Sequence, residues 1–207
     1  MIFNFFSDPI GTIFFIIALI IGITVHEFFH AYSALLLGDP TAKYAGRVTI
    51  NPLKHLDPVG SLFLLLAGFG WGKPVPINPA RLKYGVGGEI ITAAAGPLSN
   101  LAVALIFILF YKLFMVLGFD PNLLAFKFLA TVFMANIILM VFNLLPIPPL
   151  DGANFIKPFL SYEQQAKYQQ FGPFALFAII LLEYSFNIPL ISALVSFVIK
   201  FITNLIL

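Results

Sequence analysis

The chain has 207 residues, of which 60% are hydrophobic and only 10% are charged, and its mean hydropathy is +1.01. An ordinary soluble domain carries about 25% charged residues, and a soluble protein of this size could not bury so many apolar side chains. The composition therefore excludes a soluble enzyme, a nucleic-acid-binding protein and a disordered chain. The net charge of +2 indicates no polyanionic partner, and the absence of cysteine excludes disulfides and thiolate metal sites. We expect one membrane-embedded domain over residues 1–207.

Six apolar stretches are the expected membrane segments. They cover residues 9–37, 58–69, 86–117, 122–145, 171–186 and 188–207. A spanning helix needs about 20 apolar residues, so the second stretch is too short to cross and the fifth is marginal. We therefore expect an all-α polytopic membrane protein with five to six segments, including a small re-entrant or β-hairpin element between the first and third.

The first stretch lacks the features of a cleaved signal peptide. Residues 1–25 contain no lysine or arginine, and Asp8 is their only charged residue. A secretory signal would carry a positive amino-terminal region, so we expect a permanent span. In the connection that follows, residues 45–50 are β-branched at three positions, which predicts a short strand.

Positive side chains predict the orientation. They gather in the connections 38–57, 71–89 and 151–170, which favours the cytoplasmic side for all three. This arrangement requires the second stretch to enter the membrane and return on the same side. The amino terminus would then lie outside.

The sequence HEFFH at residues 26–30 is the strongest chemical signal. On a helix, His26 and His30 lie on one face, so both imidazoles can bind one metal ion, and Glu27 can act as a general base on a water molecule. The motif also occurs by chance in soluble helices. Ionisable groups within a membrane helix are costly, however, and are usually functional.

A catalytic zinc ion usually has three protein ligands, so the two histidines need a partner. His55 and the acids near the spans are the candidates. Asp151 follows a proline-rich break, and the topology with a re-entrant second stretch brings it to the same side of the membrane as His26. Its alternative role is that of a helix cap or turn residue.

These residues resemble the site-2 protease family of intramembrane zinc metalloproteases. The resemblance rests on HEFFH (26–30), GPLSN (96–100) and NLLPIPPLDG (143–152), and it covers roughly residues 20–155. The segments 51–60 and 70–79 look like those of compact bacterial and archaeal members, which lack a PDZ insertion and a nucleotide-sensing domain.

The resemblance implies that one zinc ion is held by His26, His30 and Asp151, with Glu27 as the catalytic base. Asn143 would bind substrate or the developing oxyanion, although hydrogen bonding between helices is its alternative role. His55 could be a spare ligand, a transition-state donor or a loop residue paired with Asp57.

The expected function is zinc-dependent hydrolysis of peptide bonds within or near transmembrane segments of membrane proteins, in a prokaryotic cell membrane and on its cytoplasmic side. The expected partners are those substrates and the lipid bilayer; the sequence does not predict an oligomeric state. Residues 45–50 and 74–79 could hold an unwound substrate by backbone bonding. The alternative functions are a metal-binding transporter and an inactive scaffold of the same fold.

Overall fold

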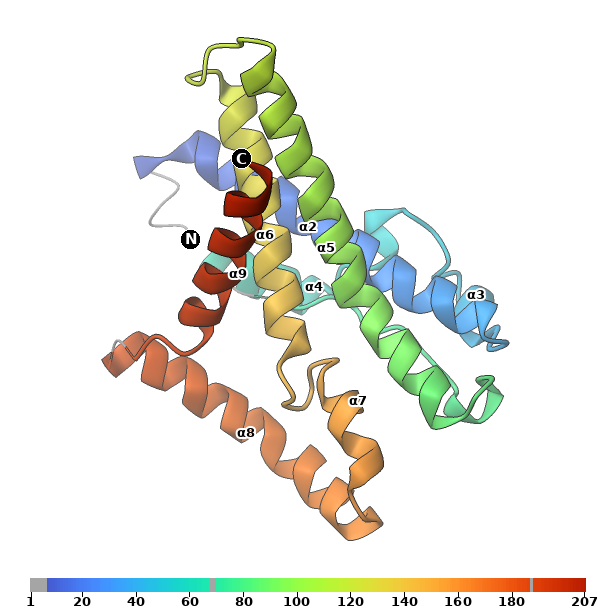
Figure 1. The fold of residues 1–207 in the computed structure, drawn as a ribbon. Coiled ribbons are helices and arrows are strands. Elements are labelled where there is room, and N and C mark those ends of the chain that lie inside the picture. The colour runs from blue at the N-terminus through green and yellow to red at the C-terminus, as the bar shows by residue number, and fades with distance from the viewer. Residues whose placement is uncertain (1–6, 68–69, 187) are drawn as a thin grey trace.

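Three long apolar helices form the centre of the molecule (Figure 1). The computed structural model describes residues 7–67, 70–186 and 188–207. In these residues α2 (Pro9–Leu36), α5 (Val86–Val116) and α6 (Leu124–Leu144) are each long and apolar enough to cross a membrane. The pair α8 (Tyr162–Phe186) and α9 (Ile191–Ile206), bent by 83°, raises the number of candidate spans to four if it forms one span. The all-α membrane class is confirmed, and five to six segments stay a prediction.

Two contacts define the directions of the central helices. Asp8 caps α2 by accepting a hydrogen bond from Gly11 N, and its carboxylate also pairs with Lys127 of α6 at 2.7 Å. The starts of α2 and α6 therefore lie at the same end of the bundle. At the other end, Lys83 N donates to Leu37 O over 2.7 Å, which joins the start of α5 to the end of α2.

Buried small and branched side chains pack the central helices together. Ala18 of α2 contacts Val132 and Ala135 of α6 in one cluster, in which all three are almost completely buried. A second cluster joins α5, α6 and α9 around Ile137. Alanines at a helix contact allow a close approach of backbones, which favours packing of helices in lipid.

The connection between α2 and α5 holds short elements. They are α3 (Thr41–Tyr44), η1 (Pro52–Lys54), α4 (Pro58–Ala67) and η2 (Pro79–Arg81). The connection leaves and returns at the same end of the bundle, and the ten residues of α4 cover only about 15 Å. Both facts agree with an element that does not cross, while its entry into the bilayer stays a prediction; residues 68–69 of the expected stretch lie outside the described residues.

The expected strand at residues 45–50 is wrong. Gly46 adopts a φ of 66°, and the bonds Gly46 N to Lys43 O and Arg47 N to Ala42 O end α3 in a left-handed cap. The backbone N–H groups of residues 49 and 51 then make local hydrogen bonds, so this β-branched segment does not pair with another strand. Within the described residues, the β-type pairing is a single bridge between Leu56 and Gly72.

The polar stretch before the fifth apolar segment is also helical. Beyond α6 lie α7 (Ala153–Ile156) and η3 (Lys157–Phe159), and α8 then begins nine residues before the expected apolar start at Phe171. Ser161 and Gln164 exchange hydrogen bonds between their side chains and backbone N–H groups, at 2.8 and 3.4 Å. This reciprocal cap starts α8 within a polar stretch, so hydropathy alone does not reveal where the helix begins.

Candidate metal centre

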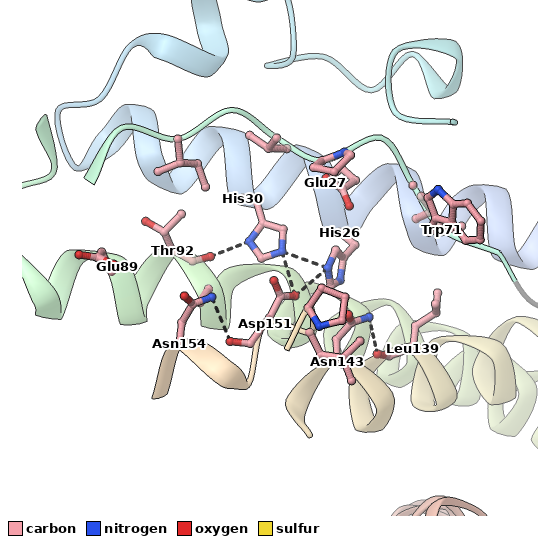
Figure 2. A pocket seen from close by; sticks show the side chains of 18 of the residues that line it. His26, Glu27, His30, Trp71, Glu89, Thr92, Leu139, Asn143, Asp151 and Asn154 are labelled. Carbon is pink, nitrogen blue, oxygen red and sulfur yellow. Dashed lines mark hydrogen bonds and ion pairs between the residues drawn. The ribbon is translucent and has the colours of Figure 1, made fainter. Parts of the chain in front are cut away.

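The face of α2 that turns towards α5 and α6 carries both histidines of the HEFFH sequence. His26 and His30 are 7% and 6% exposed, and their Nε2 atoms are 3.0 Å apart. The four-residue spacing places the two rings one turn apart on one face of the helix. Figure 2 shows both rings pointing into the same small region.

Asp151 reaches this region from the loop after α6 (Figure 2). Its Oδ2 atom lies 3.0 Å from Nε2 of His26 and 3.1 Å from Nε2 of His30. Three candidate ligand atoms thus lie within 4.8 Å of one another. The following residue must be small, because a Cβ at Gly152 would lie 2.3 Å from the carbonyl oxygen of Leu144.

The opposite nitrogen of each ring is bound by α5. His26 Nδ1 lies 2.7 Å from Oδ1 of Asn100, and His30 Nδ1 lies 2.7 Å from the carbonyl oxygen of Thr92. A carbonyl oxygen can only accept, so both rings donate through Nδ1, which leaves Nε2 as the nitrogen that can offer a lone pair to a metal ion. This arrangement is typical of metal-binding histidines, whose outer partners fix the tautomer.

The three converging atoms can all donate an electron pair to a metal ion when both Nε2 atoms are unprotonated. Two imidazole lone pairs and one carboxylate oxygen repel one another at about 3 Å unless a positive charge lies between them. Zn²⁺ accepts nitrogen and carboxylate ligands at about 2.0–2.2 Å, and tetrahedral ligands at that bond length lie roughly 3.3 Å apart. The donor set fits a zinc ion after a small outward shift.

Gly96 lets α5 approach the histidines. A Cβ at this position would lie 2.3 Å from Nε2 of His30 and 2.7 Å from Nε2 of His26. Any side chain larger than hydrogen would therefore occupy the space that a metal ion needs. Gly96 and Asn100 are one turn apart on α5, so the two ends of the GPLSN sequence serve the same site, Gly96 by leaving space and Asn100 by a hydrogen bond to His26.

Glu27 lies beside this cluster, under the part of the connection between α2 and α5 that follows α4. Its side chain is 14% exposed, and its Oε2 atom is 3.8 Å from a guanidinium nitrogen of the buried Arg47. A Cβ at Gly72 would lie 3.2 Å from Glu27 Oε1, so the backbone of the connection passes directly over the carboxylate. The same guanidinium donates to the carbonyl oxygens of Lys73 and Pro74, at 2.5 and 2.7 Å.

The cluster opens into a cavity of about 520 Å³. Its lining includes His26, Glu27, His30, Asp151 and Asn143 together with apolar side chains from α2, α6 and the connection. The Asn143 amide donates one hydrogen bond to Leu139 O, at 3.0 Å, within α6. The structure thus brings the predicted residues of the site, apart from His55, to one cavity.

His55 occupies a different place. Its ring is fully buried and lies with Nε2 2.6 Å from the carbonyl oxygen of Thr49, while Nδ1 has no partner among the described residues. Burial lowers the pKa of His55, and the nearby charge of Arg47 lowers it further, which favours the neutral ring. His55 does not belong to the residues that line the cavity. Of the three alternatives for this residue, pairing with Asp57 gives way to the contact with Thr49. Its placement favours a structural role.

Fold and site together define a polytopic membrane protein with a buried His-His-Asp cluster and an adjacent glutamate. Residues 119–183 match Peptidase family M50. The chain is 40% identical over 163 residues to YwhC of Bacillus subtilis, whose name describes it as a candidate zinc metalloprotease; the match covers 76% of this chain and 74% of YwhC. No solved structure matches.

Two mycobacterial proteins of the same description, both named Rip2, are also similar. The protein from Mycolicibacterium smegmatis is 32% identical over 157 residues, which cover 70% of this chain and 57% of the relative. The protein from Mycobacterium tuberculosis H37Rv is 31% identical over 171 residues, which cover 79% and 63%. The chain therefore spans less than two thirds of the Rip2 proteins. The chain belongs to peptidase family M50, the site-2 protease family of zinc metalloproteases.

Sequence reasoning missed two contributors to the site, Thr92 on α5 and Arg47 in the connection. Gly96 and Asn100 entered it only as the ends of the GPLSN sequence, without their contacts to the histidines. An asparagine and a glycine one turn apart in an apolar helix are a usable signal for a polar contact in the membrane. The contribution of Thr92 is a backbone carbonyl, which no residue type reveals.

Proposed function

We propose that this protein is an intramembrane zinc endopeptidase that hydrolyses peptide bonds within or near transmembrane segments of other membrane proteins. The observation that carries the proposal is the convergence of three candidate metal-ligand atoms, from His26, His30 and Asp151, beside a glutamate in one cavity. Membership of a metalloprotease family supports the same chemistry.

His26, His30 and Asp151 would hold the zinc ion. When bound there, zinc would polarise a peptide carbonyl and make water acidic enough to lose a proton near neutral pH. Glu27 would accept that proton and pass it to the leaving amine nitrogen, as a general base and then a general acid. The second amide N–H of Asn143 has no hydrogen-bond partner among the described residues. This N–H would donate to the substrate carbonyl oxygen.

The lining of the cavity favours an apolar peptide. Ile23, Leu139 and Phe142 face it from the helices, and Val75 and Ile77 face it from the connection. A helical substrate hides its carbonyls in bonds within the helix, so it must unwind to reach Glu27. The irregular segment 74–79 remains a candidate surface for the unwound strand, whereas the part of this idea that relied on a strand at residues 45–50 no longer holds.

We place the active site towards the cytoplasm of a prokaryotic cell. Most lysines and arginines lie at the end of the bundle where α2 ends and α5 begins, and positive residues favour that side. The bacterial relatives reported above support the prokaryotic part of this assignment.

The test is cleavage by the purified chain reconstituted in liposomes. The substrate is a labelled single-span peptide with a Gly-Pro pair near one end, and zinc is measured by elemental analysis. Glu27→Gln should keep its zinc and lose cleavage by roughly 10²- to 10⁴-fold. Glu163→Gln, at an exposed ion pair on α8, is the matched control. Equal cleavage by Glu27→Gln and the native chain would refute the protease, and zinc flux into the same liposomes would favour the transporter.

A further inference from the structure

A second asparagine lies behind the metal centre, in a helix that carries no candidate ligand. Asn136 of α6 is completely buried, and its Oδ1 atom accepts a hydrogen bond from Nδ2 of Asn100 at 2.9 Å. Asn100 is equally buried and contacts His26 directly. A chain of two amides therefore runs from α6 through α5 to the first histidine.

Two backbone carbonyls define the direction of the hydrogen bonds that link Asn136, Asn100 and His26. Nδ2 of Asn136 donates to Val132 O at 2.9 Å, so its Oδ1 must face Asn100. Nδ2 of Asn100 donates to Gly22 O at 3.1 Å and to Asn136, so its own Oδ1 must face His26. Because a carbonyl oxygen cannot donate, reversal of either amide would bring oxygen against oxygen.

The consequence for His26 follows directly. Its Nδ1 meets a fixed acceptor and must carry a proton, which directs Nε2 towards His30 and Asp151 as the nitrogen that can bind a metal ion. We propose that Asn136 is a positioning residue of the metal centre, which acts through Asn100 to hold His26 in the tautomer and orientation that bind a metal ion. This inference rests on the proposed function, because it assumes that the cluster holds zinc.

Interhelical bonding without any effect on the site is the competing explanation. Asparagines often join helices in membranes, and this role would predict a loss of stability alone. The two explanations differ in metal affinity, since an outer-shell partner of a metal ligand changes affinity by about 10- to 100-fold. Asn136 is one bond further away, so we expect a loss of about 3- to 10-fold on the same scale.

The experiment measures zinc affinity of the purified full chain in detergent, by competition with a chromophoric chelator. Asn136→Val removes both polar atoms. Asn136→Thr has the same shape as the valine variant. Its hydroxyl can donate to Val132 O, four residues back, and accept from Asn100. Ile137→Ala is the control for packing, because Ile137 is the next residue on the same helix, is fully buried and belongs to an apolar cluster that contains neither asparagine.

The expected result is weaker zinc binding and an altered visible spectrum of bound Co²⁺ in Asn136→Val, with Asn136→Thr closer to the native chain. Ile137→Ala should lose thermal stability at native affinity. The inference is overturned if Asn136→Val binds zinc as tightly as the native chain, if the threonine variant is no better than valine, or if Ile137→Ala weakens binding equally. Failure of the native chain to bind zinc would instead overturn the proposed function.

Discussion

The backbone N–H of Gly152 donates a hydrogen bond of 2.7 Å to the carbonyl oxygen of Asn143, at the end of α6. This bond folds the chain back on itself immediately after the helix and directs Asp151 towards α2. The proline-rich sequence between the two residues thus forms a closed turn, and Asn143 and Asp151 face the same cavity.

A substitution in this turn should displace Asp151. Gly152→Ala would place a Cβ 2.3 Å from Leu144 O and 2.5 Å from Leu145 O, so the turn must open. We expect cleavage to fall by about 100-fold, the cost of a displacement of roughly 1 Å at an active site. Peptide cleavage and zinc content measured on the same preparation check this, and native values for both would show that the turn does not control the carboxylate.

A methyl group at Gly96 should block the metal position itself. Gly96→Ala is expected to abolish stoichiometric zinc, because the new Cβ would lie within 2.7 Å of both imidazole Nε2 atoms. Gly87→Ala is the matched control on the same helix, since its Cβ would meet its nearest neighbour at an ordinary 3.6 Å. Elemental analysis gives the answer, and full zinc occupancy in Gly96→Ala would contradict the location of the site.

Arg47 should affect turnover without affecting the metal. Arg47→Met leaves the carbonyl oxygens of Lys73 and Pro74 without their donor and removes the positive charge near Glu27. Each bond to a charged group contributes about 1.5–3 kcal/mol, so we expect a mobile connection and slower cleavage at unchanged zinc content.

Lys54→Met is the control for this prediction, because it removes a positive charge from an exposed position of the same connection. Cleavage kinetics at several peptide concentrations separate an effect on KM from one on kcat. If both variants lose activity equally, then the total charge of the connection matters and the specific contacts of Arg47 do not.

Zinc should stabilise the folded chain. A ligand at 100 times its Kd contributes about 2.7 kcal/mol, which corresponds to a rise in Tm of roughly 5–10 °C for a chain of this size. A chelator should reverse the rise. His26→Ala should show neither effect in the same thermal scans, whereas an equal rise in that variant would mean that the stabilising zinc binds elsewhere.

Local patterns predicted the histidine pair and the three central helices well. The i, i+4 spacing of His26 and His30 determines their shared face once α2 is a helix. Long apolar runs are equally direct: the starts of α2 and α5 coincide with the expected starts, and the other ends of α2, α5 and α6 lie within two residues of the expected ends. The position of Asp151 could be predicted from the topology. If the second stretch does not cross, the third and fourth stretches cross out and back, and Asp151 lies on the side of the histidines.

Long-range contacts were not readable in the same way. The residues that orient the histidines lie more than 60 positions away in the sequence, and Thr92 contributes through its backbone. The failed strand at residues 45–50 has a local cause, since Gly46 takes a left-handed conformation that β-propensity does not weigh. The early start of α8 depends on a polar cap, which hydropathy ignores.

The candidate metal ligands are synthesised at different times. Asp151 and His30 are 121 positions apart, so a ribosome has completed more than half of the polypeptide between them. During insertion into the bilayer the nascent chain offers only a two-imidazole pair, which binds metal weakly. The complete set of three candidate ligands therefore exists only after α6 has formed and the turn that follows it has closed.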